Sequence, residues 1–125
     1  MTNPDQIIDA AIISAGANVA PRVTPADIEA NIYSEHYFTA EDGVIGRLVM
    51  TEPGRNPSAP LALSLLTFCV LVLRNGFTVT GESACASPEN FNADIGRKVA
   101  RANAVQKIWP LLGFALKERL HAEGG

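Results

Sequence analysis

The stretch Thr67-Phe68-Cys69-Val70-Leu71-Val72-Leu73-Arg74-Asn75-Gly76-Phe77-Thr78-Val79-Thr80 decides the fold of this chain. Asn75-Gly76 separates an apolar run from an alternating one, which is typical of a β-hairpin closed by a two-residue type I′ turn. Counting outward from this turn pairs Val72 with Val79 and Leu71 with Thr80. The first strand is apolar on both faces, so we expect it to be central in the sheet, or covered by a helix or another subunit.

A helix is the alternative for the first part of this stretch. Leu and Ala dominate the start of the segment from Pro60 to Arg74, and Asn75-Gly76 would then form a left-handed cap. The β-branched and aromatic residues between Thr67 and Val72 favour strands instead. A helical turn near Leu61 to Leu65 is expected to precede them.

A long helix is predicted after the hairpin. Ser87-Pro88-Glu89 is a capping residue followed by proline, which is a common helix start. Apolar residues then recur at helical spacing: Phe91, Ile95, Val99, Ala102, Val105, Trp109, Leu112, Leu116 and Leu120. Pro110 lacks the amide hydrogen that a helix interior needs, so the helix should kink or break near Trp109. Residues 121–125 are expected to form a disordered tail.

Two helices are predicted before the hairpin. Asn3-Pro4-Asp5-Gln6 has the pattern of a capping box with proline at the first helical position, which predicts a short helix to about Ala15. We expect residues 1–22, which comprise this helix and a linker, to be loosely attached to the domain. Thr24-Pro25-Ala26-Asp27 repeats the pattern and predicts a second helix that ends near His36.

The segment between the second helix and the hairpin is less regular. Glu41-Asp42-Gly43 is expected to form an acidic turn, and Val44 to Thr51 a strand. Residues 52–60 contain three prolines, which exclude a helix or an inner strand, so they are predicted to form an exposed loop.

Together these patterns predict a single α+β domain over residues 23–120. A β-hairpin, or a three-stranded antiparallel sheet, packs against a long C-terminal helix and one or two N-terminal helices. The chain has 125 residues, of which 47% are hydrophobic and 18% charged, and this is enough for one hydrophobic core. The longest apolar stretch, residues 61–73, is shorter than the roughly 20 residues of a membrane helix. Because no signal peptide is recognisable either, we expect a cytoplasmic protein without membrane contact.

The sequence predicts neither a metal site nor a cofactor. Its two cysteines and two histidines lack the close ligand pairs of a zinc site. Cys69 and Cys85 fall on opposite faces of the predicted hairpin, so two free thiols are expected and not a disulfide. Buried, unreactive thiols are the favoured interpretation, although Cys85 lies near a helix start, where a thiol pKa is lowered.

A hydrolytic enzyme is not predicted either. Gly81-Glu82-Ser83-Ala84-Cys85 resembles the esterase motif G-x-S-x-G but lacks its final glycine. The only downstream histidine is His121, in the terminal tail. Ser83 is more simply a residue that satisfies backbone groups at the strand end, or one that contacts a ligand.

The basic residues Arg97, Lys98 and Arg101 cluster on one side of the predicted long helix, and they suggest a binding site. Arg97 and Arg101 are one turn apart and suit a phosphate group, while aromatic residues elsewhere suit a stacked base. The candidate ligand-binding residues are Arg97, Lys98, Arg101, Phe91, Asn90, His36, Tyr37 and Ser83. The alternatives are a solvated helical face for the cations and a core-facing stripe for Tyr33 and Tyr37.

Several stretches resemble a known phage family. The quoted residues are those from Leu66 to Cys85, Pro88 to Phe91, Ile95 to Lys98, Ala104 to Trp109 and the segment from Thr24 to Phe38. They are similar to a family of small accessory proteins of tailed bacteriophages and prophages, named after gene products 49 and 66 of two podoviruses. The likeness covers about Val23 to Leu120.

This resemblance implies expression in an infected bacterium and supplies no catalytic residues. One departure is Leu111-Leu112-Gly113-Phe114, where the family pattern has an acidic residue before the glycine and a tyrosine after it. The departure puts a polar contact at that position in doubt.

These observations give three functional hypotheses for an accessory protein of host takeover or counter-defence in the cytoplasm of the infected host. The first is a non-catalytic binding module that sequesters a small nucleotide signal of host immunity, and homo-oligomers are expected. The second is a protein-interaction module that inhibits a host enzyme through Tyr33 to Phe38 and the Pro-rich loop. Nucleic-acid binding ranks third, because the net charge is -3.

Overall fold

The central element of the fold is strand β2 (Leu66–Leu73), as the sequence predicted. In the computed structural model, which describes residues 3–16 and 20–124, it pairs with β1 (Ile32–Thr39) and β3 (Thr78–Ala84). The three strands form an antiparallel sheet of order β1-β2-β3. Alternate residues of β2 are buried, while the residues between them are half-buried on the other face. The expected α+β fold with a three-stranded sheet is confirmed.

The hairpin itself is confirmed, but its loop has three residues, Arg74-Asn75-Gly76. The Leu73 N–H donates to the Phe77 carbonyl at 2.8 Å, and the Gly76 N–H donates to the Leu73 carbonyl at 2.9 Å. Gly76 has a φ of 89°, whereas no described residue other than glycine has a positive φ. A type I′ turn requires positive φ at both central residues, so the predicted two-residue turn is wrong.

The strand register is therefore shifted by one residue from the prediction. Leu71 pairs with Val79, and Cys69 pairs with Gly81. This register places Val79 in the core, and Thr80 is exposed. The predicted register would have buried Thr80 and exposed Val79, so the burial of apolar surface decides between the two loop lengths.

The second predicted helix is shorter than expected. Helix α2 (Pro25–Ala30) has the predicted capping box between Thr24 and Asp27, but its C-terminal cap is Asn31. Residues 32–39, which we expected to continue this helix to about His36, form β1. Their aromatic and β-branched side chains favour a strand, and β2 offers them an apolar edge.

The predicted strand from Val44 to Thr51 is wrong, because these residues belong to helix α3 (Ala40–Thr51). The expected turn Glu41-Asp42-Gly43 is the first part of this helix. Thr39 and Asp42 form its capping box: the Asp42 N–H donates to Thr39 Oγ1 at 3.1 Å, and the Thr39 N–H donates to Asp42 Oδ2 at 2.9 Å. The cap starts a helix despite two glycines within the segment.

Two other parts of the N-terminal half agree with the sequence. Helix α1 (Pro4–Ser14) has the predicted capping box of Asn3 and Gln6. The turn η1 (Leu61–Leu65) is a 3-10 helix directly before β2, so the alternative of one helix from Pro60 to Arg74 is wrong. The Pro-rich residues between α3 and η1 form neither helix nor strand beyond Thr51.

The predicted long helix starts later than expected and is broken where expected. A short 3-10 turn, η2 (Pro88–Asn90), occupies the predicted start, because the Ser87 hydroxyl bonds to Glu89 and caps no helix. Helix α4 (Ala93–Gln106) starts after Asn92, whose side chain accepts from the Ile95 N–H at 3.1 Å. Helix α5 (Ile108–Ala122) follows after one residue, which confirms the break before Pro110. The domain limits at 23 and 120 and the disordered tail stay predictions.

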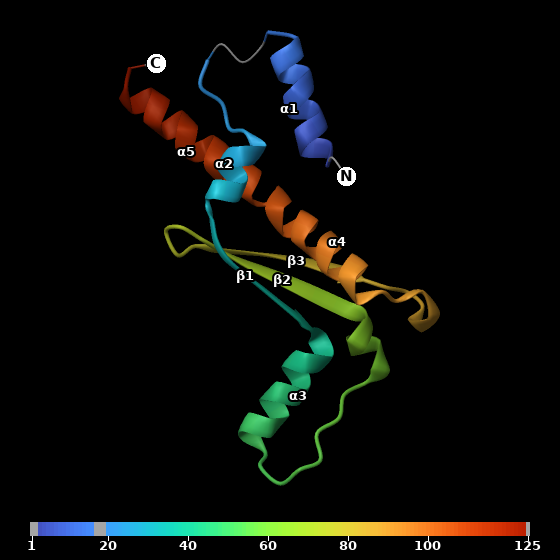
Figure 1. Ribbon diagram of the computed structural model, residues 1–125. Coiled ribbons are helices and arrows are strands. Elements are labelled where there is room, and N and C mark those ends of the chain that lie inside the picture. The colour runs from blue at the N-terminus through green and yellow to red at the C-terminus, as the bar shows by residue number, and fades with distance from the viewer. Residues whose placement is uncertain (1–2, 17–19, 125) are drawn as a thin grey trace.

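The hydrophobic core lies between one face of the sheet and the helices α4 and α2 (Figure 1). Its buried residues are Ile28, Cys69, Leu71, Leu73, Val79, Ala100, Ala104, Val105 and Ile108. A Cβ atom on Gly81 would lie only 2.2 Å from the Ala100 carbonyl oxygen and 2.3 Å from the Ala104 nitrogen. The small residues on β3 and α4 therefore allow the helix backbone to approach the sheet closely.

Candidate functional site

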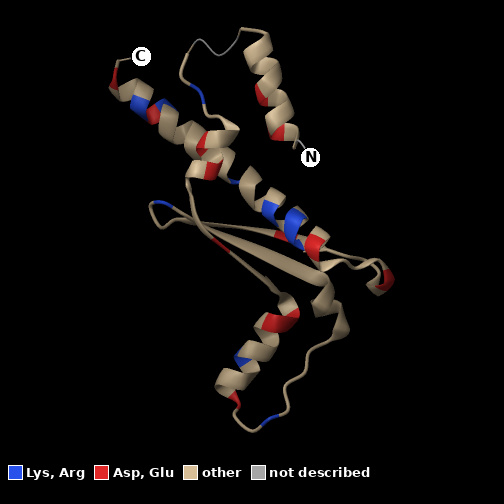
Figure 2. Ribbon diagram, viewed as in Figure 1, with Lys and Arg blue, Asp and Glu red and all other residues tan. Residues whose placement is uncertain are grey.

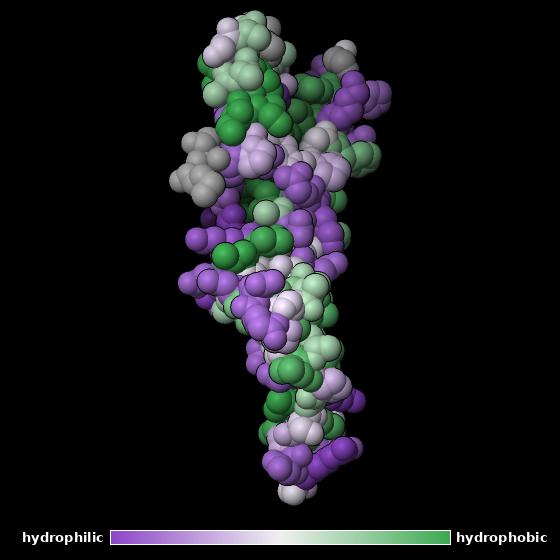
Figure 3. Space-filling view, turned by 90° about the vertical axis from the view of Figure 1, so that its right-hand side faces the viewer, coloured by the Kyte–Doolittle hydropathy of each residue, from purple (hydrophilic) through white to green (hydrophobic). Residues whose placement is uncertain are grey.

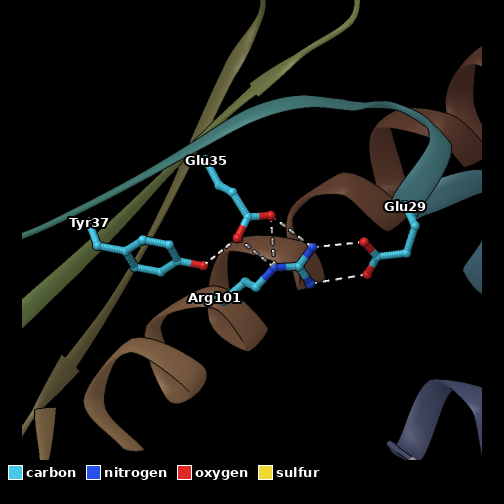
Figure 4. A network of polar contacts seen from close by, with 4 residues as sticks. All are labelled: Glu29, Glu35, Tyr37 and Arg101. Carbon is cyan, nitrogen blue, oxygen red and sulfur yellow. Dashed lines mark hydrogen bonds and ion pairs between the residues drawn. The ribbon is translucent and has the colours of Figure 1, made fainter. Parts of the chain in front are cut away.

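Arg101 of α4 is the centre of a polar network that joins three elements of the fold (Figure 4). Its guanidinium donates to Glu29 of α2, with Nη1 3.0 Å from Oε1 and Nη2 2.7 Å from Oε2. It also donates to Glu35 of β1, with Nε 3.3 Å and Nη2 3.2 Å from Oε2. The Tyr37 hydroxyl donates to Glu35 Oε1 at 2.7 Å. One cation therefore serves two carboxylates.

The secondary structure explains why these side chains meet. Glu35 and Tyr37 are two residues apart on β1, so pleating turns both toward the side of the sheet that α4 covers. They pair with the buried residues Leu71 and Cys69 of β2. The Arg101 side chain is only 28% exposed, although it carries a charge.

The network lowers the pKa of its carboxyl group Glu35 and raises the pKa values of the Tyr37 phenol and the Arg101 guanidinium. The hydrogen bond from Tyr37 lowers the pKa of Glu35, and Arg101 adds to this effect. Burial, followed by the bond to Glu35, raises the pKa of Tyr37. The bond to Glu29 raises the pKa of Arg101, so Glu35 and Arg101 are charged and Tyr37 is a neutral phenol at neutral pH.

A groove of about 780 Å³ lies next to this network, between α1, α2 and α4. Ile28, Ala102 and Val105 are among its apolar lining residues, while Lys98, Arg101 and Glu29 are charged. Asp5 and Asp9 of α1 add two more carboxylates. Figure 2 shows acidic residues on α1 and on α2, the two helices that line the groove together with α4. The groove has no surplus of positive charge.

Helix α1 forms one wall of the groove and is held mainly by polar contacts. The Trp109 Nε1–H donates to Asp5 Oδ2 at 3.0 Å, and the Gln106 amide donates to the same oxygen at 3.4 Å. Asp9 pairs with Arg22. No residue of α1 is buried. A few hydrogen bonds and one ion pair thus hold α1 in place, and a packed apolar interface does not.

Of the predicted site residues, the structure brings three together. Arg101 and Lys98 both line the groove, and Tyr37 joins Arg101 through Glu35. Arg97 is on the same helix but pairs with Asp94, and its side chain is 45% exposed. Arg97 and Arg101 were predicted to bind one phosphate group together. Each of them is instead paired with a carboxylate of the protein.

The remaining predicted residues lie elsewhere. His36 is exposed in β1 and faces the side of the sheet opposite to that of Tyr37. Its Nε2 lies 3.1 Å from Ser34 Oγ. Asn90 is exposed in η2, and Phe91 is half-buried against Gly96 of α4. Ser83 pairs with Thr67 inside the regular strand β3, so it is not on the strained turn of an esterase motif.

Sequence reasoning missed both partners of Arg101. Glu29 and Glu35 are separated from it by 72 and 66 positions. A correct assignment of β1 would have provided one signal, since it places Glu35 and Tyr37 on the same face. The predicted helix instead placed Tyr33 and Tyr37 together, whereas Tyr33 is 69% exposed with the Arg74 guanidinium 5.8 Å from its ring centroid.

Residues 23–120 match the model of a protein family described as the phage protein (N4 Gp49/phage Sf6 gene 66) family. The chain belongs to this phage protein family. The resemblance stated from the sequence is confirmed, and it indicates an accessory protein of a bacteriophage. No curated protein and no solved structure matches the chain significantly. The four network residues lie within the family's region, whereas α1 precedes it.

Two negative findings apply to the described part of this family member. Across residues 3–16 and 20–124, no helix has the length and hydrophobicity needed to cross a membrane. Within the same ranges, no three His, Cys, Asp or Glu side chains are grouped in a way that could hold a metal ion. Both cysteines are free, as the sequence predicted.

Proposed function

We propose that this phage protein is a non-catalytic accessory protein that binds a segment of a host protein in the groove between α1, α2 and α4. It would act in the cytoplasm of the infected bacterium and inhibit or redirect its target there. The observation that carries the proposal is the pairing of Arg101 with both Glu29 and Glu35. Because the main cation of the groove is already neutralised, a protein segment suits the groove better than a polyanion does.

The lining of the groove supports a peptide as the ligand. Exposed apolar residues such as Ile13 and Ala102 can contact apolar side chains of the partner. Side-chain amides of Gln6, Asn103 and Gln106 line the groove as well, and amides both donate to and accept from peptide groups. This combination of apolar contacts with a few orienting polar groups is typical of grooves that bind a helix or an extended segment.

The absence of a catalytic role is part of the proposal. Ser83 lies in a regular strand, and its nearest downstream histidine is at the end of α5. Figure 1 shows that the C-terminal end of α5 lies far from the connection between β3 and α4. Among the predicted site residues, none has a partner that would activate it as a nucleophile.

The test is affinity capture from phage-infected cells with a groove variant and a matched control. Ala102→Arg places a long charged side chain in the groove, whereas Ala122→Arg makes the same change at an exposed position of α5 outside it. We expect a host protein to be captured by the native chain and by A122R and to be lost with A102R. Equal capture by both variants, with unchanged melting temperatures, would refute the proposal.

A small anionic ligand such as a nucleotide is the second candidate, and one observation favours it: Lys98 and Arg101 both line the groove. A phosphate would have to compete with Glu29 and Glu35 for Arg101. Thermal unfolding with mononucleotides and cyclic dinucleotides tests this candidate. A rise in melting temperature that Lys98→Glu abolishes, but Arg97→Glu does not, would replace the protein partner by a nucleotide.

Nucleic-acid binding gains no comparable support. Arg97 and Arg101 are paired with carboxylates, and the net charge of the chain is -3. Binding of this kind would weaken steeply with added salt, so a salt titration of any observed DNA or RNA affinity distinguishes it from the first two candidates.

A further inference from the structure

Helix α3 carries apolar residues that the described parts of the chain, 3–16 and 20–124, leave exposed. Val49 is 56% exposed and Met50 is 81% exposed, and no residue of the helix is buried. Helix α3 contacts η1, but Ile45 and Leu48 are only half-buried. Leu61 in η1 is itself 66% exposed. Figure 3 shows hydrophobic residues recurring along the narrow part of the molecule that α3 and the following loop form. Residues 40–60 are called the arm below.

The sheet has a matching surface. Helices α4 and α5 lie on one side of it only, and α3 extends away from its other side (Figure 1). That open face carries Phe38 and Phe68, whose rings stack with centroids 5.5 Å apart, together with the half-buried Val70 and Val72. A sheet face of this kind is normally covered by a second layer of helix or sheet.

The chain connection prevents α3 from covering its own open face. Thr39 is both the last residue of β1 and the N-cap of α3, so no residue remains to turn the helix back. The capping box with Asp42 fixes the direction in which the helix leaves the strand. The loop that connects the helix to η1 is restricted in its backbone conformations by three prolines, Pro53, Pro57 and Pro60. Within one protomer, the apolar side of α3 and the open face of the sheet therefore both stay uncovered.

We propose that a second copy of this chain supplies the missing layer, with the arm of each protomer packed on the open sheet face of the other. The contact is isologous, since each copy offers the same helix and the same face, and it closes as a two-fold dimer. The arm carries Arg47, which is exposed, and the rim of the open face carries Glu82, so a pair of opposite charges is available across the interface.

The exposed apolar area supplies most of what such an interface needs. The side chains of Val44, Val49, Met50, Leu61 and Phe38 expose on the order of 450 Å² of apolar surface per protomer. Two protomers would bury about twice this area before any polar rim is counted, and specific interfaces begin at roughly 1,200 Å² in total. The half-buried Phe68, Val70 and Val72 and the charged rim provide the remainder. This surface is separate from the groove between α1, α2 and α4, so the dimer would carry two accessible grooves.

The first experiment measures the mass of the full chain in solution by light scattering and sedimentation. We expect a dimer of twice 13.3 kDa for the native chain and a monomer for Met50→Glu and for Val49→Glu. Ile95→Glu is the control, because Ile95 is a comparably exposed apolar residue of a helix, on α4 outside the interface and the groove. It should remain dimeric. A monomeric native chain, or a dimer that both arm variants leave intact, overturns the proposal.

The second experiment identifies the surface that the arm contacts. A photoreactive phenylalanine at position 50, in a mixture of isotopically light and heavy chains, reports crosslinks between protomers by mass spectrometry. Crosslinks from position 50 to residues 66–73 or 78–84 of the other copy are expected. Crosslinks to α3 of the other copy, or to the edge of β1, overturn the exchange of arms even if the protein is dimeric.

Discussion

Arg101 in α4 and Glu29 in α2 form a two-point contact, with both guanidinium nitrogens Nη1 and Nη2 bonded to one carboxylate. Glu35 of β1 accepts from the same guanidinium, so the contact fixes the start of the family's region against the middle of its long helix. The Arg101 side chain is 28% exposed and that of Glu29 56%, so the stabilisation comes from the two-point geometry and the shared cation more than from shielding.

Replacing Arg101 should therefore destabilise the protein more than replacing its neighbour. Arg101→Met removes a two-point contact and leaves Glu29 and Glu35 close together without a cation, and we expect the free energy of unfolding to fall by about 1–2 kcal/mol. Arg97→Met removes only an exposed pair with Asp94 and should cost less than about 0.5 kcal/mol. Urea denaturation measures both changes. Equal losses would mean that the network is not a significant source of stability.

The lowered pKa of Glu35 predicts a pH dependence of stability with a defined sign. A carboxylate whose folded pKa lies below its unfolded value of 4.5 stabilises the fold fully above that value. The contribution is lost as the pH falls through the lower folded pKa. Consequently, the difference in unfolding free energy between the native chain and Glu35→Gln should be greatest at neutral pH and shrink below about pH 4.5.

Tyr37 provides the internal control for this pH dependence. Its hydrogen bond is the main cause of the lowered pKa of Glu35, so Tyr37→Phe should raise that pKa toward its usual value. In the Y37F background, the effect of Glu35→Gln should then vary less with pH. Denaturation curves of the four proteins between acidic and neutral pH test this, and an unchanged pH dependence would point to Arg101 as the dominant cause.

The parts of the fold that were predicted correctly are those with local signals. The box of Thr24 and Asp27 identified α2, and Pro110 identified the break between α4 and α5. The identical box of Thr39 and Asp42 was overlooked, because the apolar residues after it were interpreted as a strand. Strand β1 was missed since it is stabilised by β2, which lies far along the chain.

The hairpin shows why a turn motif alone does not determine a register. Asn75-Gly76 is compatible with a two-residue loop and with a three-residue loop that ends in Gly76. Only the packing of Val79 and Gly81 against α4 selects the second loop. The candidate site follows the same rule: Arg101 was recognisable from its helix, but Glu29 and Glu35 come close to it only in the folded chain.

The close approach of α4 to β3 predicts a large effect of one methyl group. Gly81→Ala would place its Cβ 2.2 Å from the Ala100 carbonyl oxygen, and backbone atoms cannot move aside as a flexible side chain can. We expect a loss of about 3 kcal/mol or more in unfolding free energy. Gly113→Ala is the control, because a Cβ there would meet no heavy atom within 4 Å beyond the neighbouring residues and backbone of α5 itself. It should stabilise the helix by up to about 1 kcal/mol.

The two cysteines should differ strongly in their reaction with a thiol reagent. Cys69 is completely buried in β2, and burial also raises its pKa, so it is both inaccessible and protonated at neutral pH. Cys85 is half-buried beyond the end of β3, where its thiol donates to the Ser87 carbonyl at 3.1 Å. We expect one thiol per chain to react rapidly with the reagent, and Cys85→Ser should abolish this rapid phase. The other thiol should react slowly, at a rate that follows unfolding. Because Cys69 lies opposite Gly81 in the hairpin, Gly81→Ala should speed the slow phase while Gly113→Ala does not. Rapid labelling of both thiols in the native chain would show that β2 is not held between its neighbours and α4.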